Sequence, residues 1–112
     1  MVVFASEYKI YKGVVVKMER RDLYLEKMSA QVEQYSAKLA GMRGKAAEVH
    51  ADMKLEYLNQ VEKLENKRDG LKEKYEQIKK ASDSSWEDMK EGTENAWNDL
   101  KESIAKAAKH FR

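Results

Sequence analysis

Apolar residues recur at alternating steps of three and four along much of this 112-residue chain, and this spacing constrains the fold more than any other feature. Such steps place side chains on one face of an α-helix, at the a and d positions of a coiled coil. Between Met53, Tyr57 and Val61 two steps of four follow each other, which is a stutter that relaxes the supercoil. We define the seam as Leu25, Met28, Val32, Tyr35, Leu39, Met42, Val49, Met53, Tyr57, Val61, Leu64, Leu71, Tyr75 and Ile78.

The last part of the chain carries a second apolar stripe, which repeats every eleven residues. The segment Ser85–Glu91 is echoed by Ala96–Glu102, and each copy contains a tryptophan. Eleven residues make almost three helical turns, so the stripe stays on one face. An amphipathic ribbon of this kind must be covered by another surface. We define the docking face as Trp86, Met89, Trp97, Leu100, Ile104 and Phe111.

Two glycines, Gly41 and Gly44, interrupt the first stripe without shifting its phase. Because Leu39 and Met42 continue the seam past Gly41, and Val49 continues it past Gly44, we expect one long coiled-coil helix over residues 18–80, bent at most. The alternative is a turn at Gly41-Gly44, which would give a three-helix bundle, since each glycine costs a helix about 1 kcal/mol.

Breaks at residues 81–84 and near residue 17 divide the chain further. Ser84 and Glu87 form a capping box, which predicts that an amphipathic helix begins at Ser84 and covers residues 84–112. Residues 1–17 are rich in β-forming side chains and contain Gly13. They are interpreted as a short extended arm or hairpin, as a loose tail, or as residues that precede a natural start at Met18.

The composition favours an all-α fold of long and short amphipathic helices. Proline is absent, and 38% of the residues are charged, with a net charge of +2 and both signs interspersed. Because acidic and basic residues are interspersed, the chain lacks the clustered basic residues that nucleic-acid binding requires, so we expect no nucleic-acid partner. No apolar run is long enough to span a bilayer, and cysteine is absent. We therefore expect a cytoplasmic protein, with peripheral attachment to a membrane as an alternative.

The sequence offers no constellation that favours an enzyme. His50 and His110 are far apart and match no ligand spacing, so we expect surface histidines, with no catalytic residue, metal ligand or cofactor. Arg68 occupies a seam position and is expected to reach solvent or to pair with an acid of a neighbouring helix. We expect self-association through the seam into a dimer or tetramer. A membrane surface or another helical protein is the alternative partner of the docking face.

Several segments resemble small bacterial coiled-coil proteins of the stress-response or apolipoprotein-like type. The resemblance is carried by Arg21–Met28, Asp52–Tyr57, Lys67–Asp69 and, most specifically, by Ser85–Gly92 followed by Ala96–Leu100. Some magnetosome-associated coiled coils look similar. The resemblance implies an all-helical, non-enzymatic protein with a role in stress, and it adds association with lipid or mineral surfaces as further expectations.

Overall fold

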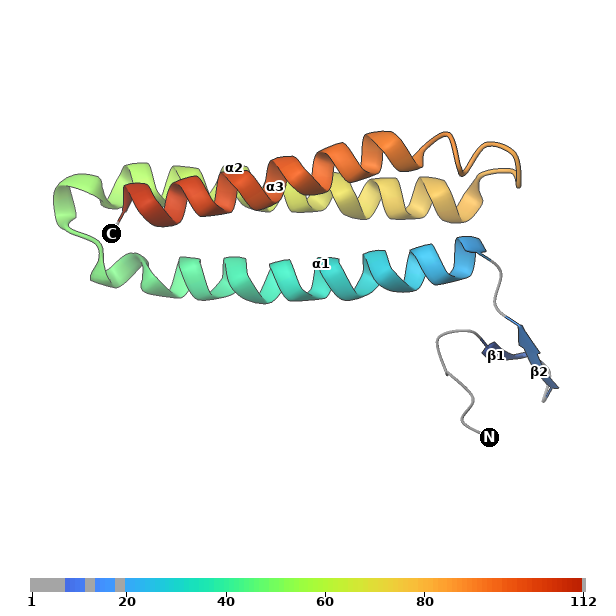
Figure 1. Ribbon diagram of the computed structural model, residues 1–112. Helices are drawn as coiled ribbons and strands as arrows, with labels where there is room; N and C mark the ends of the chain where they lie inside the picture. The colour runs from blue at the N-terminus through green and yellow to red at the C-terminus, as the bar shows by residue number, and fades with distance from the viewer. Residues whose placement is uncertain (1–7, 12–13, 18–19, 112) are drawn as a thin grey trace.

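The computed structural model describes residues 8–11, 14–17 and 20–111, and most of this length is helical. Its helices are α1 (Arg20–Gly44), the short 3₁₀ helix η2 (Lys45–Glu48), α2 (Ala51–Lys80) and α3 (Lys90–His110). The predicted all-helical class is therefore confirmed. Before α1, strands β1 (Tyr8–Tyr11) and β2 (Val14–Lys17) pair antiparallel, with Tyr8 opposite Lys17 and Tyr11 opposite Val14. This hairpin lies outside the stack of helices (Figure 1).

The chain turns back between α1 and α2, so the single helix predicted over residues 18–80 is wrong and the three-helix alternative is the one observed. The turn lies just beyond the two glycines, because Gly41 and Gly44 remain in α1. Val49 and His50 make the turn with extended backbones, at φ −76° and ψ 138° and at φ −54° and ψ 139°. The apolar spacing of the seam continues through the turn because η2 is itself helical. The apolar residues of the turn also face the interior of the bundle.

Helix α3 begins at Lys90, six residues later than the capping box predicted. Residues 83–89 form successive turns, in which the amides of Ser85 and Trp86 donate to the carbonyl oxygen of Ser82. No side chain caps the first amides of α3. This irregular segment crosses the end of the bundle, where it lowers Trp86 onto the start of α1. The predicted start of a helix at Ser84 is therefore wrong, because this segment is irregular and packs the indole of Trp86 into the core.

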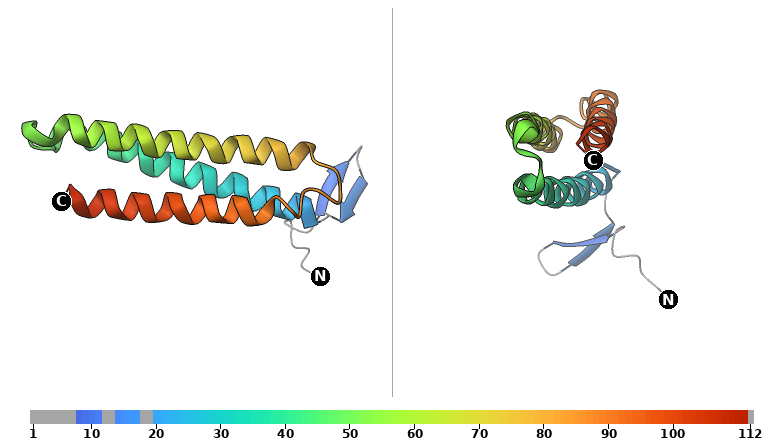
Figure 2. Two further views of the ribbon diagram at one scale, coloured as in Figure 1. Left: turned by 90° about the horizontal axis from the view of Figure 1, so that it is seen from above. Right: turned by 90° about the vertical axis from the view of Figure 1, so that its left-hand side faces the viewer.

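The three long helices run side by side, with α3 returning towards the turn between α1 and α2 (Figures 1 and 2). Seen end on, they occupy the corners of a triangle (Figure 2). Helix α1 packs along α2, and α2 packs along α3, whereas α1 and α3 approach each other less closely. Helix α2 is therefore the central support, and the side between α1 and α3 is the more open one.

Two clusters of buried residues form the core. The central cluster contains Leu39, Leu64, Leu71, Trp97, Leu100, Ile104 and Ala107. The second cluster, which we call the tryptophan end, contains Tyr24, Leu25, Met28, Ile78 and Trp86. Burying large apolar side chains contributes about 1.5–3 kcal/mol each, so these clusters dominate the stability of the bundle. Among the described helices, none is both long and apolar enough to cross a membrane.

Candidate functional site

The seam residues lie inside the single chain. Fully buried members are Leu25, Met28, Leu39, Tyr57, Val61, Leu64, Leu71 and Ile78, and half-buried members are Val32, Tyr35, Met42, Val49, Met53 and Tyr75. Because α1 folds back on α2, the two halves of the seam cover each other. Self-association through the seam therefore stays a prediction, and it requires the hairpin of α1 and α2 to open.

The docking face is also covered by the same chain, except at one residue. Trp86, Trp97, Leu100 and Ile104 are buried and Phe111 is half-buried, whereas Met89 is 37% exposed. The indole of Trp97 lies 5.4 Å from the ring of Tyr35, between ring centroids, and that of Trp86 lies 6.0 Å from Tyr24. The indole N–H of Trp97 has no hydrogen-bond partner. Helix α3 thus packs through its tryptophan face on α1 and α2.

Arg68, the charged residue at a seam position, keeps its guanidinium at the edge of the core. It donates to the carboxylate of Asp69 at 2.9 Å and to the hydroxyl of Ser36 on α1 at 3.2 Å. Of the two expectations for Arg68, pairing with an acid of a neighbouring helix is wrong, because Asp69 lies on the same helix. Because the side chain remains 18% exposed, the charge is not fully desolvated.

A groove of about 480 Å³ runs between α1 and α3, on the side of the bundle where the two helices are least closely packed. Its floor is apolar and its walls contain small residues, so a helix could approach closely. Three lysines line it as well. We define the groove by these residues: Tyr35, Ala37, Lys38, Gly41, Met42, Lys45, Lys101, Ile104, Ala105 and Ala108.

The three lysines of the groove have no carboxylate partner within the described part of the chain. The ammonium group of Lys38 lies 5.6 Å from the centre of the Tyr35 ring, and Lys45 and Lys101 are exposed. An apolar floor with unpaired cations at its rim suits an occupant that is itself apolar on one side and acidic at its edges.

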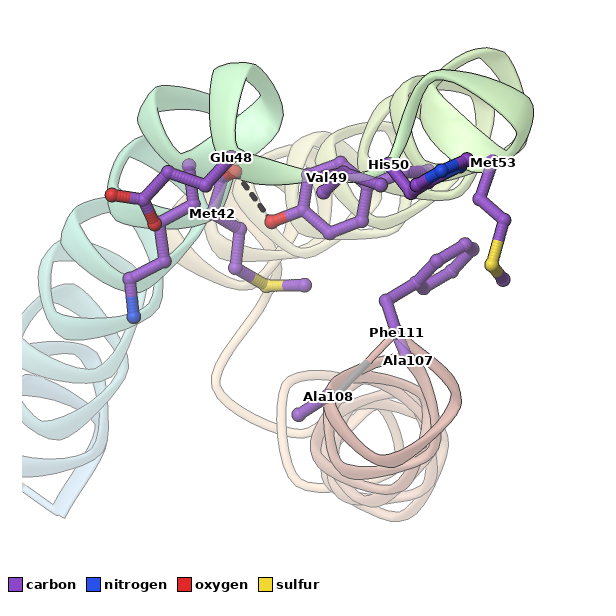
Figure 3. Close-up of a pocket in the computed structure, with 10 residues that line it drawn as sticks. Met42, Glu48, Val49, His50, Met53, Ala107, Ala108 and Phe111 are labelled. Atoms are coloured by element: carbon purple, nitrogen blue, oxygen red, sulfur yellow. Dashed lines mark hydrogen bonds between the residues drawn. The ribbon is translucent and has the colours of Figure 1, made fainter.

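A cavity of about 440 Å³ adjoins the groove at the turn between α1 and α2 (Figure 3). Both are lined by Met42, Lys45 and Ala108. In Figure 3, Met53 and Phe111 border the open space from α2 and from the end of α3. The hydroxyl of Tyr57 donates to the carbonyl oxygen of Met42, which ties the start of α2 to the end of α1.

The ionisable groups near these surfaces have structural partners. Burial raises the pKa of Tyr57, with a smaller contribution from the carboxylate of Glu48. Burial and the neighbouring Glu94 raise the pKa of Tyr24, which donates to that carboxylate at 2.9 Å. The ring of His50 accepts a hydrogen bond from the amide of Asp52 at the start of α2. Both phenols donate hydrogen bonds that join two helices, from Tyr24 to Glu94 and from Tyr57 to Met42.

The described residues contain no cluster of three or more histidine, aspartate or glutamate side chains that could hold a metal ion. His110 contacts Glu56 at 3.1 Å, on the surface between α3 and α2.

No protein-family model, curated protein or solved structure matches this chain. The surfaces of the bundle are therefore the guide to its function. Sequence reasoning missed the groove, because its residues come from two helices that are far apart in the chain. A signal was present in the small residues Ala37 and Gly41, one helical turn apart, and in Ala105 and Ala108.

Proposed function

We propose that this chain is a non-enzymatic helical interaction protein, and that it binds a second copy of itself through the groove between α1 and α3. One observation carries the proposal: the groove is apolar, uncovered and lined by three lysines without carboxylate partners. A segment of a second copy laid there would bury the apolar floor.

The charges along α3 favour a second copy as the occupant. Steps of three and four connect Glu91, Glu94, Asn98, Lys101, Ala105 and Ala108 along one side of this helix. The row is acidic where α3 begins and basic with small residues where it lines the groove. Two copies related by a twofold axis, with their α3 helices antiparallel, would place Lys101 of one opposite Glu91 of the other.

The test is the solution mass, measured by light scattering over a wide range of protein concentration. The wild type should shift from monomer to dimer as the concentration rises. Ala105→Glu, which puts a carboxylate into the apolar groove, should weaken the dimer about tenfold or more. Ala40→Glu is the matched control, since Ala40 is exposed on α1 and does not line the groove.

A charge exchange sharpens this test. Lys101→Glu and Glu91→Lys should each weaken the dimer, and the double variant should recover it, because the two ends remain complementary after the exchange. Thermal unfolding of each variant checks that the bundle is intact. A wild-type chain that stays monomeric at every concentration, or a double variant no better than its parents, contradicts the proposal.

A second candidate function is reversible binding to a lipid surface through residues 84–112. The observation that favours it is the irregular connection from Ala81 to Met89, which would let α3 move as a unit and present Trp97, Leu100 and Ile104 once its packing on α1 and α2 is lost. Both indoles are already buried, so a shift in tryptophan emission is a poor readout. Co-sedimentation with vesicles of phosphatidylglycerol tests it, and protein that stays in the supernatant contradicts it.

A further inference from the structure

The turn between α1 and α2 keeps the helical phase of the seam. Leu39, Met42, Ala46, Val49 and Met53 follow one another at steps of four and three through the whole connection. If residues 45–50 became α-helical, α1 and α2 would join into one helix from Arg20 to Lys80. Its apolar residues would still lie on one face. The apolar register that closes the interior at the turn would therefore also serve a continuous helix.

The turn is also close to a helical conformation. Residues Lys45–Glu48 already form the 3₁₀ helix η2, and Gly44 has helical angles of φ −62° and ψ −29°. Only Val49 and His50 are extended, and their φ angles of −76° and −54° are compatible with a helix. Straightening the turn therefore requires mainly a rotation about ψ at two residues.

The side chains around the turn are less well packed than those at the tryptophan end. Val49 and Met53 are half-buried and line the open cavity of about 440 Å³. Within the connection, backbone hydrogen bonds run from Val49 N to Ala46 O and from Met53 N to His50 O. The hydroxyl of Tyr57 also donates to the carbonyl oxygen of Met42, a bond that the exchange would have to break and re-form between the two copies. A continuous helix would satisfy the amides at the start of α2 and the carbonyls at the end of α1, which a turn leaves partly unpaired.

We propose that two copies of this chain exchange their α1 helices by straightening residues 45–50. Each α1 then packs on the α2 and α3 of its partner and re-forms the contacts that it makes within one chain. These include the hydrogen bonds from Arg21 to Ala81 and from Tyr24 to Glu94. Near the dimer axis, the half-buried Met42, Val49 and Met53 of the two copies cover each other. This exchanged dimer does not use the groove.

The exchange must be slow, because α1 leaves its own core before it meets another. Refolding from urea at high protein concentration should therefore give a dimer that persists for hours after dilution, separable by size-exclusion chromatography. A groove dimer would dissociate and re-form quickly. The two modes of association are thus distinguished by their rates.

His50→Pro tests the hinge directly. Proline fits the observed φ of −54°, and the extended Val49 suits the position before a proline. Within a continuous helix, proline at this place should lower the yield of persistent dimer about a hundredfold. His50→Ala is the matched control, since it removes the same capping side chain without fixing the turn, and it should dimerise at least as well as the wild type.

A distance measurement excludes other dimers. Dyes are placed on the exposed Lys27, near the start of α1, and Glu76, near the end of α2. These two helix ends meet when the hairpin is closed, as the hydrogen bond from Arg21 to Ala81 shows. On one continuous helix they would be about 70 Å apart, from a rise of about 1.5 Å per residue. Energy transfer within a labelled chain, refolded with excess unlabelled protein, should fall in the dimer. Unchanged transfer, a persistent His50→Pro dimer, or the absence of a persistent wild-type dimer would each overturn the exchange and leave the groove proposal untouched.

Discussion

At the end of the bundle where α1 begins, Arg21 donates to the carbonyl oxygen of Ala81 at 2.7 Å and to Asp83 at 2.8 Å, and Trp86 covers the core behind it. At the opposite end, Met42, Val49 and Phe111 surround a cavity of about 440 Å³. One end is thus closed by a buried indole and by the two hydrogen bonds of Arg21. At the other end Tyr57 and Ala107 are buried, but open space remains between them and the half-buried side chains.

This difference indicates where the bundle is held and where it can change. The segment after α2 lacks regular helix, yet it is fixed by Trp86 and by the two bonds of Arg21. The connection after α1 is nearly helical, yet apart from the bond of Tyr57 to Met42 it is bordered by half-buried side chains and an open cavity. Regular secondary structure is therefore a poor guide to local stability in this chain, because buried area and satisfied polar groups decide it.

The largest expected effect is a contrast between two aromatic deletions. Trp86→Ala should lower the free energy of unfolding by about 3–5 kcal/mol, since the indole is buried against Tyr24. Phe111→Ala should cost about 1–2 kcal/mol, because the ring is half-buried beside an existing cavity. Urea unfolding followed by circular dichroism measures both. Equal losses would show that the two ends are equally well packed.

A smaller contrast is expected between two arginines. Arg21→Ala should cost about 1–2 kcal/mol, because the side chain is 16% exposed and ties α1 to the carbonyl end of α2. Arg43→Ala should cost less, since that guanidinium is half exposed and pairs with Glu65 near the turn end. The same unfolding experiment applies. A greater loss in the Arg43 variant would reverse the comparison of the two ends.

The smallest effect concerns pH. The hydrogen bond from Arg43 lowers the pKa of Glu65, so its carboxylate is more easily ionised in the folded chain than in the unfolded one. Its contribution to stability is therefore present at neutral pH and is lost as the pH falls through the lowered pKa. Wild type and Glu65→Gln should differ slightly at neutral pH and converge in acid. A difference in stability between the two proteins that grows as the pH falls would contradict this prediction.

Much of the helical architecture could be predicted from residue spacing, while its turns could not. Leu39, Leu64 and Leu71 are buried where the seam places them, and Trp97 and Leu100 are buried in the second stripe. The capping box at Ser84 did not set the start of α3, because burial of Trp86 outweighs one cap. Met89, counted in the docking face, is exposed because it lies in the turns before α3.

The candidate groove could not be predicted, since Lys38 and Lys101 come together only when α3 returns alongside α1. Their positions on separate helices give no pattern within one stretch of sequence. The two strands before α1 were one of the alternatives left open by the β-forming residues of the arm. Their pairing needs only neighbouring residues, which is why local composition could suggest it.

Residue spacing alone indicates which side of each helix is apolar, because the period of three and four residues is a property of local helical geometry. The reversal of the chain after Gly44 and the open groove between α1 and α3 became visible only in the folded chain. This is because the same seam can pack on another chain or on itself. The choice depends on the free energy of closing one loop against that of associating two molecules, and residue spacing contains neither quantity.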